Sequence, residues 1–455
     1  MGFHNIEKKS FWYNILYHYV AFWHNKIFYR KIVKLNEDNI PEKDPAIFTP
    51  NHQNALMDAL AMLFTVKRQL VFMARSDIFK KFAPILYFLK ILPIYRIRDG
   101  IDSLKNNKKV FDKTVEVLNA NNGLVILPEG SHKWERKLRQ LKKGFARIAF
   151  QTQLSGTLKA PLKIIPVGID YDDYIHCRSR LLVNFGEPFE ISRFLDEYEK
   201  NPATALNRVK EELSKRMKKL IIHIESKKHY DFINEWRVYY RNEMCLLIGS
   251  NPSSEADGFF ADQQLVKMLD KTAAENPEII ERMESIYNNI LKKLKQFDLK
   301  ITDLNANVNF FFLTVRFFLL TIFFPFFIYG AINHVFPFFL PYYISRKVED
   351  VTFHSSFMFV LTMLFFPVFY FIQSLIVFFL FTGETALLYL LSLPLSAAIS
   401  WKWSKHLKEV LTNFKLFKFS NTAEFKLVKV QINLLKELTA DIVKKHLIKF
   451  DKQNF

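Results

Sequence analysis

Between Ala46 and about Pro188, short apolar runs alternate with longer amphipathic stretches, which is the pattern of an α/β domain. Each run is short enough to be a buried strand, and the stretches between the runs carry apolar positions at helical spacing. The expected strands cover 46–49, 70–74, 92–95, 124–128, 164–169 and 181–186, and the expected helices cover about 54–64, 77–89, 101–120 and 141–153. We assign 39–190 to this α/β domain, with a sheet flanked by helices.

The pattern changes twice after this domain. Residues 191–305 are charged and helical in pattern, so we interpret them as a helical extension without chemistry of its own. Residues 306–401 hold two almost continuously apolar blocks, Phe310–Tyr343 and Phe353–Ser400, of 34 and 48 residues. Because one membrane crossing takes about 20 residues, each block is long enough for a transmembrane hairpin. We expect this C-terminal α-helical transmembrane region to be a non-catalytic anchor.

Charge indicates how the membrane segments are oriented. The chain has a formal net charge of +19, yet the stretch between Ala306 and Trp401 holds three cations and three acidic residues, so the whole excess lies outside it. Residues 402–455 form a basic tail with 12 Lys against 5 acidic residues. The positive-inside tendency places the tail and the basic α/β domain in the cytoplasm, so the number of crossings should be even. Four short crossings are favoured, and a re-entrant first block that leaves two is the alternative.

The N-terminal residues 1–38 contain an aromatic stretch from Phe11 to Tyr29 that includes Lys26. They lack the clean apolar core and small-residue cleavage site of a signal peptide. We expect an amphipathic helix in the membrane interface, with a plain packed helix as the alternative. The chain has two cysteines, Cys177 and Cys245, and no CxxC pair, which argues against a disulfide framework or a structural zinc site.

The sequence from Thr49 to Leu60 follows an expected strand and opens an expected helix, and it holds a histidine and an aspartate. On one regular helix a step of six residues rotates about 240° away, so His52 and Asp58 can meet only across the bend from loop to helix. Such a pair could act as a general base oriented by a carboxylate. The alternative is an ordinary capping or surface pair.

A second candidate site lies at residues 124–132, where an apolar strand ends in Pro-Glu-Gly-Ser-His. Glu129 and the backbone amides of this turn could face a small polar substrate, or the turn could be an ordinary exposed loop. Six cations follow the turn, and they could bind phosphate or form a solvated surface. They are Lys133, Arg136, Lys137, Arg139, Lys142 and Lys143.

Four blocks in this order resemble the glycerolipid acyltransferase family, which includes lysophosphatidate and glycerol-3-phosphate acyltransferases. They are Asn-His-Gln-Asn-Ala-Leu-Met-Asp (51–58), Ile-Leu-Pro-Ile-Tyr-Arg-Ile-Arg (91–98), Leu-Pro-Glu-Gly-Ser (127–131) and Ile-Ile-Pro-Val-Gly-Ile (164–169). The resemblance implies an acyltransferase-type mixed sheet and a catalytic role for His52 and Asp58. It implies substrate-binding roles for Arg96, Arg98, Glu129, Gly130, Ser131 and Pro166, to which we add Lys143 from the basic run.

Two departures leave the acceptor open. Most members of the family place four residues between the histidine and the aspartate, whereas five separate His52 from Asp58, as in fungal-type glycerol-3-phosphate acyltransferases. His132 stands where many lysophosphatidate enzymes carry arginine, and a histidine that could be neutral at cytoplasmic pH cannot be assumed to bind phosphate. The acceptor could therefore be glycerol-3-phosphate, 1-acylglycerol-3-phosphate, or an amino-acid or other lysolipid.

The resulting hypothesis is an integral membrane O-acyltransferase of phospholipid synthesis that takes its acyl group from acyl-CoA or acyl carrier protein. No metal or other cofactor is expected, and the partners are membrane lipids and not nucleic acid. Three alternatives are a metal-dependent lipid phosphatase that uses His52, Asp58, Glu129 and His132, a covalent mechanism through Cys177, and a silent lipid-binding scaffold.

Overall fold

The computed structural model describes residues 5–95, 101–306 and 309–451. The chain divides into two compact units, which are described separately. One unit, called the catalytic unit here because it holds the candidate pair His52 and Asp58, comprises Met1–Ile222 together with Ser345–Val360. The other, the helical unit, comprises His223–Ile344 together with Leu361–Phe455. The short second segment of the catalytic unit comes from the middle of the apolar region, which the sequence had not indicated.

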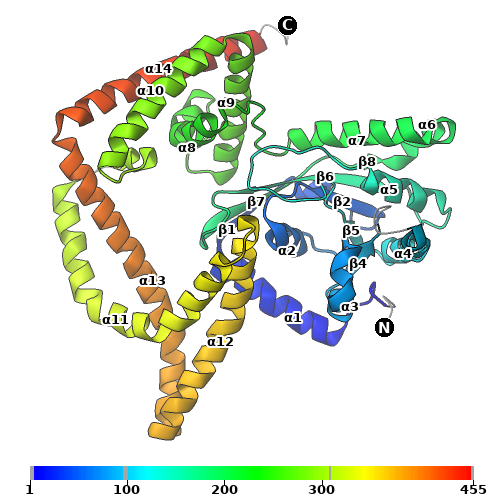
Figure 1. The fold of residues 1–455 in the computed structure, drawn as a ribbon, viewed down its shortest axis with the longest axis horizontal. Helices are drawn as coiled ribbons and strands as arrows, with labels where there is room; N and C mark the ends of the chain where they lie inside the picture. The colour runs from blue at the N-terminus through cyan, green and yellow to red at the C-terminus, as the bar shows by residue number, and fades with distance from the viewer. Residues whose placement is uncertain (1–4, 96–100, 307–308, 452–455) are drawn as a thin grey trace. The chain divides into compact units, whose positions relative to one another are not determined.

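A mixed sheet in the order β1-β7-β6-β2-β5-β3-β4 forms the centre of the catalytic unit (Figure 1), and β8 pairs with β6. Neighbouring strands of the sheet are parallel, except that β6 runs antiparallel to β7 and to β8. The strands are β1 (Tyr29–Leu35), β2 (Ala46–Pro50), β3 (Leu70–Arg75), β4 (Ile91–Ile94), β5 (Gly123–Val125), β6 (Lys163–Tyr171), β7 (Ser179–Phe185) and β8 (Phe189–Glu190). All six expected strands are present, and the mixed α/β fold class is confirmed.

The helices of the catalytic unit bury the apolar faces of this sheet. A continuous core joins one face of the strands to α4, α5 and α7, and α2 lies on the other side of the sheet (Figure 1). The helices are α1 (Phe11–Phe22), α2 (Ala55–Thr65), α3 (Phe79–Phe88), α4 (Ile101–Asn119), α5 (Gly144–Leu154), α6 (Leu195–Lys200) and α7 (Pro202–Lys218). The four helices expected between the strands are therefore present, with boundaries shifted by a few residues.

The N-terminal segment is more than an interfacial helix. α1 is followed by a π-helical turn, Trp23–Phe28, and then by β1, which pairs in parallel with β7 at the edge of the sheet. The sequence had assigned residues 29–35 to the interfacial helix. Apolar and polar residues do not alternate regularly in this segment, because an edge strand buries only part of its side chains. The sequence therefore did not identify it as a strand.

The catalytic unit extends past the expected boundary at residue 190, because the chain after α7 crosses directly over β6. At Gly168 in β6, an added methyl group would lie 2.2 Å from the carbonyl oxygen of Leu220. The side-chain amide of Asn184 donates to the same carbonyl at 3.4 Å. Residues 191–222, which the sequence grouped with the helical extension, therefore pack on the sheet.

The helical unit contains three helices of the extension and a helix from the C-terminal tail. α14 contacts both α9 and α10, and the Trp236 indole of α8 donates to Thr439 of α14 at 3.0 Å. The basic tail is thus a packed helix rather than an extended segment. The bounds are α8 (Tyr230–Leu247), α9 (Glu255–Glu275), α10 (Pro277–Gln296) and α14 (Ala423–Asp451).

Three helices among the described residues are long and apolar enough to cross a membrane. They are α11 (Phe310–Arg346), α12 (His354–Leu380) and α13 (Gly383–Ser420). The expected hairpin in the first apolar block is wrong: α11 is one helix over the whole block, visibly bent in Figure 1, with Pro325, Pro337 and Pro341 inside it. The second block does form a pair of helices.

We predict that Gly168→Ala destabilises the full chain by about 1–3 kcal/mol, because the new methyl group collides with backbone that cannot rotate away. Gly144→Ala is the matched control, since a methyl group there meets nothing within 4 Å and its effect should stay within about 0.5 kcal/mol. Thermal unfolding of both variants in detergent micelles measures the difference. Equal midpoints for the two variants would contradict the close packing of Leu220 on β6.

Candidate active site

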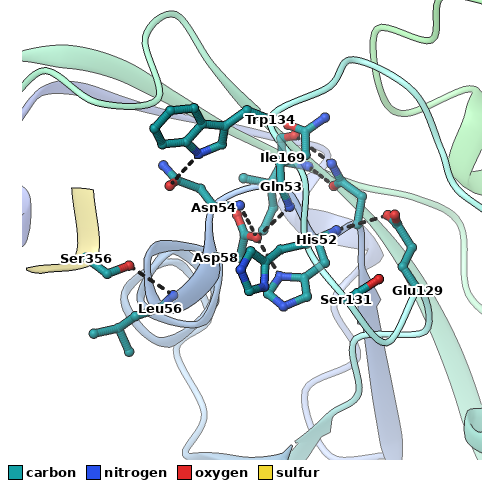
Figure 2. Close-up of polar contacts among 12 residues, drawn as sticks. His52, Gln53, Asn54, Leu56, Asp58, Glu129, Ser131, Trp134, Ile169 and Ser356 are labelled. Carbon is teal, nitrogen blue, oxygen red and sulfur yellow. Dashed lines mark hydrogen bonds and ion pairs between the residues drawn. The ribbon is translucent and has the colours of Figure 1, made fainter. Parts of the chain in front are cut away.

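The candidate active site begins where β2 ends and the chain turns into α2 (Figure 2). Asn51, at the start of this loop, is buried and continues the strand pairing with its side chain. Its amide nitrogen donates to the carbonyl of Ile169 at 3.0 Å, and its oxygen accepts from the Ile169 N–H at 2.6 Å. This two-point bond holds the loop 51–54 against β6, so the next residue leaves the sheet in a fixed direction.

His52 and Asp58 meet across the bend from loop to helix. The His52 Nδ1 lies 2.8 Å from the Asp58 Oδ2, and the Asp58 side chain is fully buried while 13% of the His52 side chain is exposed. Since Asp58 occupies Nδ1, Nε2 is the ring nitrogen that can take a proton from a substrate. The geometry is that of a histidine general base held in one tautomer by a carboxylate.

The buried Asp58 carboxylate is held by more than the histidine. Its Oδ2 accepts from the backbone N–H groups of Gln53 and Asn54, each at 2.7 Å, and its Oδ1 accepts from the Tyr171 hydroxyl at 2.7 Å. Burial raises the pKa of Tyr171 well above its usual value, and the nearby Asp58 charge adds to the effect, so the hydroxyl stays a donor. These bonds satisfy a charge that would otherwise be costly to bury.

Glu129 supports the backbone of the catalytic loop. Its Oε1 accepts from the His52 N–H at 3.0 Å, and its Oε2 accepts from Arg139 Nε at 2.6 Å. Burial raises the pKa of Glu129, and the Arg139 charge together with the His52 backbone bond works against this rise. Both carboxylate oxygens therefore have internal partners, and the substrate-binding role of Glu129 stays a prediction.

The turn after Glu129 places Arg139 at the centre of a small network. Gly130 has a φ of +69°, which a residue with a side chain adopts only with strain. Arg139 donates to the Ser131 hydroxyl at 2.8 Å, to the Ser131 carbonyl, and to the His52 carbonyl at 3.2 Å. One guanidinium thus joins the Pro-Glu-Gly-Ser turn to the His52 loop.

His132 lies beside His52. The two rings are 5.0 Å apart between centroids, and the His132 ring also contacts Phe353 at 4.6 Å. Burial lowers the pKa of His132, and the neighbouring His52 lowers it further, while Asp350 at 3.6 Å opposes the shift. A lowered pKa favours the neutral form of His132.

The remaining expected site residues differ in their position. Pro166 is buried in β6 beside Thr49 of β2, the strand that leads to His52. Lys143 is partly buried and directly precedes α5. Arg96 and Arg98 lie outside the described residues, so their expected contact with the acceptor phosphate stays a prediction.

Arg139 and Arg136, two of the six cations after the turn, make contacts inside the protein. Arg139 binds Glu129 as described, and Arg136 is buried, with its guanidinium near Asp170 and over the Tyr174 ring. Lys133 is exposed and pairs with Glu135 at 3.3 Å. Among the described residues there is no group of three His, Cys, Asp or Glu side chains with a spacing suited to a metal ion.

Sequence reasoning missed Asn51, Asn54 and Tyr171 as parts of the site, and it gave Arg139 only as one of six possible phosphate-binding cations. Asn54 donates its backbone N–H to Asp58 and its side-chain amide to the Tyr174 carbonyl at 3.0 Å. Both asparagines lie inside the His-Asp block, so their position beside His52 was a usable signal. Tyr171 carried no such signal, and the basic run did not show that Arg139 would bond to Glu129 and the His52 loop, because only folding brings β6 and the basic run to the loop.

Comparisons with known proteins point to acyltransferases. Residues 31–170 match the family model described as Acyltransferase. The chain is 37% identical over 105 residues to glycerol-3-phosphate O-acyltransferase 1 of Saccharomyces cerevisiae, a match that covers 22% of this chain and 13% of the yeast protein. It is also similar to the crystal structure of a 1-acyl-sn-glycerophosphate acyltransferase from Thermotoga maritima, with 20% identity, a TM-score of 0.27, and coverage of 46% of this chain and 79% of that one.

We predict that Arg139→Ala lowers both stability and activity, because it leaves the buried Glu129 carboxylate without its cation and frees the His52 loop. Loss of a buried charged partner costs about 1–3 kcal/mol. Lys133→Ala, in the same basic run, removes only an exposed pair and should change stability by less than about 1 kcal/mol. Unfolding midpoints and turnover of both variants check this, and indistinguishable variants would show that Arg139 does not support the site.

Proposed function

We propose that this chain, whose residues 31–170 form a domain of the glycerolipid acyltransferase family, transfers an acyl group from a thioester to the hydroxyl of a glycerol-phosphate acceptor at a membrane surface. The observation that carries the proposal is the His52–Asp58 pair, in which a partly exposed imidazole is held by a fully buried and fully hydrogen-bonded carboxylate. A surface or capping pair of histidine and aspartate would not need a buried carboxylate with hydrogen bonds from the loop and from Tyr171. The reaction requires no metal or redox cofactor in this proposal.

The mechanism uses His52 twice. The imidazole Nε2 takes the proton from the acceptor hydroxyl while the hydroxyl oxygen attacks the thioester carbonyl carbon. The tetrahedral intermediate then collapses, the carbon–sulfur bond breaks, and the imidazolium returns its proton to the leaving thiolate, which leaves as a thiol. Asp58 does not exchange a proton in this scheme; it stabilises the imidazolium and keeps Nδ1 protonated.

Glycerol-3-phosphate is the acceptor we favour. The yeast relative is named for this acceptor, and five residues separate His52 from Asp58, which is the fungal-type spacing. 1-Acylglycerol-3-phosphate and other lysolipids are the competing acceptors. For the donor, acyl-CoA and acyl carrier protein both carry the required thioester.

The surface of the catalytic unit supports a place at the membrane. α1 and α3 are joined by a contact between the Tyr13 and Phe88 rings, whose centroids lie 6.2 Å apart. Both helices leave large apolar side chains exposed, and this combination suits an interface that takes up aromatic residues. The exposed side chains include Phe11, Trp12, Ile15, Phe22, Phe82 and Ile85.

The order of the apolar helices supports two complete crossings. Among the described residues, no helix of spanning length and apolarity lies between Ile222 and Phe310, so α11 begins on the side of the catalytic unit. It also ends there, because Ser345–Val360 folds with that unit. We therefore infer that α11 is re-entrant and that α12 and α13 cross as a pair. The basic residues outside the apolar region favour a cytoplasmic location for the catalytic side.

We predict that His52→Ala and Asp58→Asn each lower turnover by about 100 to 10,000-fold, the usual contribution of a general base, while the protein still inserts into membranes. The assay follows transfer of a labelled acyl group from acyl-CoA to glycerol-3-phosphate, with 1-acylglycerol-3-phosphate and an acyl-amino-acid lipid in parallel. Glycerol-3-phosphate should be the best acceptor. Wild-type turnover in a folded His52→Ala variant would show that His52 is not the base.

A second prediction concerns the membrane topology. In a variant free of the native Cys177 and Cys245, a cysteine at Glu384, between α12 and α13, should react with an impermeant thiol reagent added to sealed cells. A cysteine at Lys347 should react only after the cells are opened, since that residue lies on the catalytic side. Labelling of Lys347→Cys in sealed cells would overturn the two-crossing arrangement.

A further inference from the structure

Residues 345–360, which we call the strap, join α11 to α12 in the sequence but fold with the catalytic unit. The strap contains a short 3-10 turn, Val351–Phe353, and the first turns of α12. Its side chains reach the loop that carries His52, and two of these contacts are hydrogen bonds to the loop and to the start of α2. The C-terminal apolar region therefore supplies residues to the site that we had expected to be separate from it.

Ser356 provides a partner for the first turn of α2. The first N–H groups of a helix have no partner inside the helix, and the N-cap residue of α2, Asn54, makes no side-chain cap. The Leu56 N–H instead donates to the Ser356 hydroxyl at 3.2 Å (Figure 2), and Ser356 is buried. The helix that carries Asp58 is thus capped by a residue 300 positions away in the sequence.

Ser355 fixes the residue that leads into α2. Its hydroxyl donates to the Asn54 side-chain oxygen at 2.6 Å, and the Trp134 indole donates to the same oxygen at 3.3 Å. The Asn54 backbone N–H in turn donates to the Asp58 Oδ2 at 2.7 Å. A chain of hydrogen bonds therefore runs from the strap through Asn54 to the carboxylate that orients His52.

The two ends of the strap are anchored on either side of these serines. On one side, the Phe353 ring packs against the His132 ring, next to His52. On the other, the buried Phe359 contacts the rings of Phe28 and His24, at 5.4 and 6.2 Å between centroids. Apolar contacts on both sides hold Ser355 and Ser356 in register with the loop.

We infer that Ser355 and Ser356 are positioning residues for acyl transfer, and that the strap completes the catalytic loop by holding Asn54 and the start of α2 in place. The inference rests on the proposed function of His52 and Asp58. Neither serine contacts the reacting atoms in this scheme. Both act through Asp58, so their loss should lower kcat and leave the binding of donor and acceptor nearly unchanged.

A purely structural role for the strap would have a different signature. Loss of the serines would then lower the unfolding midpoint, and any loss of activity would be independent of Asp58. A double-mutant cycle separates the two roles, because residues that act through one another are not additive.

The test compares Ser355→Ala/Ser356→Ala with the wild type in the acyl-transfer assay, on whichever acceptor the wild type uses best. The kcat should fall about tenfold, as expected for two lost hydrogen bonds, with each KM changed by less than about twofold. In an Asp58→Asn background the same substitutions should lower kcat by less than about twofold further. Ser396→Ala is the matched control, because this buried serine of α13 donates to the Leu393 carbonyl of its own helix at 2.9 Å.

Hydrogen exchange of the peptide covering 51–58 gives a readout that needs no acyl transfer. Exchange should be faster in Ser355→Ala and in Ser356→Ala than in Ser396→Ala, and Ser356→Thr, which keeps the accepting oxygen, should restore protection at Leu56. These single variants also stand in if the double variant does not fold. Unchanged exchange, an unchanged kcat, or an equal fold-loss in the Asp58→Asn background would each overturn the inference. If the wild type transfers no acyl group, the exchange result still tests the strap, and only the proposed function fails.

Discussion

The buried carboxylate of Asp58 is the group on which the rest of the site depends. An unpaired charge in a protein interior is costly, so each neighbour of Asp58 has to supply a hydrogen bond or a charge. The loop supplies two backbone N–H groups, β6 supplies the Tyr171 hydroxyl, and His52 supplies its Nδ1. Satisfying this one carboxylate therefore fixes the loop, the first turn of α2 and the tautomer of the histidine together.

The same requirement explains why the supporting residues come from distant parts of the chain. The backbone N–H groups of Gln53 and Asn54 are already used by Asp58, so the outer side of the loop takes its partners from other elements. Its outer side is fixed by Glu129 through the His52 N–H, and by Arg139 through the His52 carbonyl. The strap adds Ser355 and Ser356 from the apolar region. A catalytic loop with this construction is rigid only when several elements have already packed.

The local pattern of apolar and polar residues was enough to predict the buried strands and the turns that follow them. The six expected strands are continuous apolar runs, and the His-Asp and Pro-Glu-Gly-Ser blocks follow two of them, so both strands and the two candidate turns could be found from the sequence. β1 could not, because an edge strand such as Tyr29–Leu35 alternates weakly. The roles of Tyr171 and Arg139 depend on which segments meet after folding, and no spacing in the sequence encodes that. The division of the first apolar block was also wrong, since its length fits two short legs as well as the single bent helix α11.

The strap links the chemistry of the site to the membrane through covalent connectivity. Its two ends continue directly into α11 and α12, which are both long and apolar enough to cross a membrane. If both serines are needed to orient Asp58, the catalytic loop reaches its active geometry only while the apolar helices hold the strap in place. An acyltransferase with this arrangement would be poorly active as a detached soluble domain, even though the sheet, the histidine and the aspartate all lie within residues 29–222. The apolar region would then contribute to catalysis through the hydroxyl groups of Ser355 and Ser356. The helices α11 and α12 would be needed for turnover as well as for anchoring.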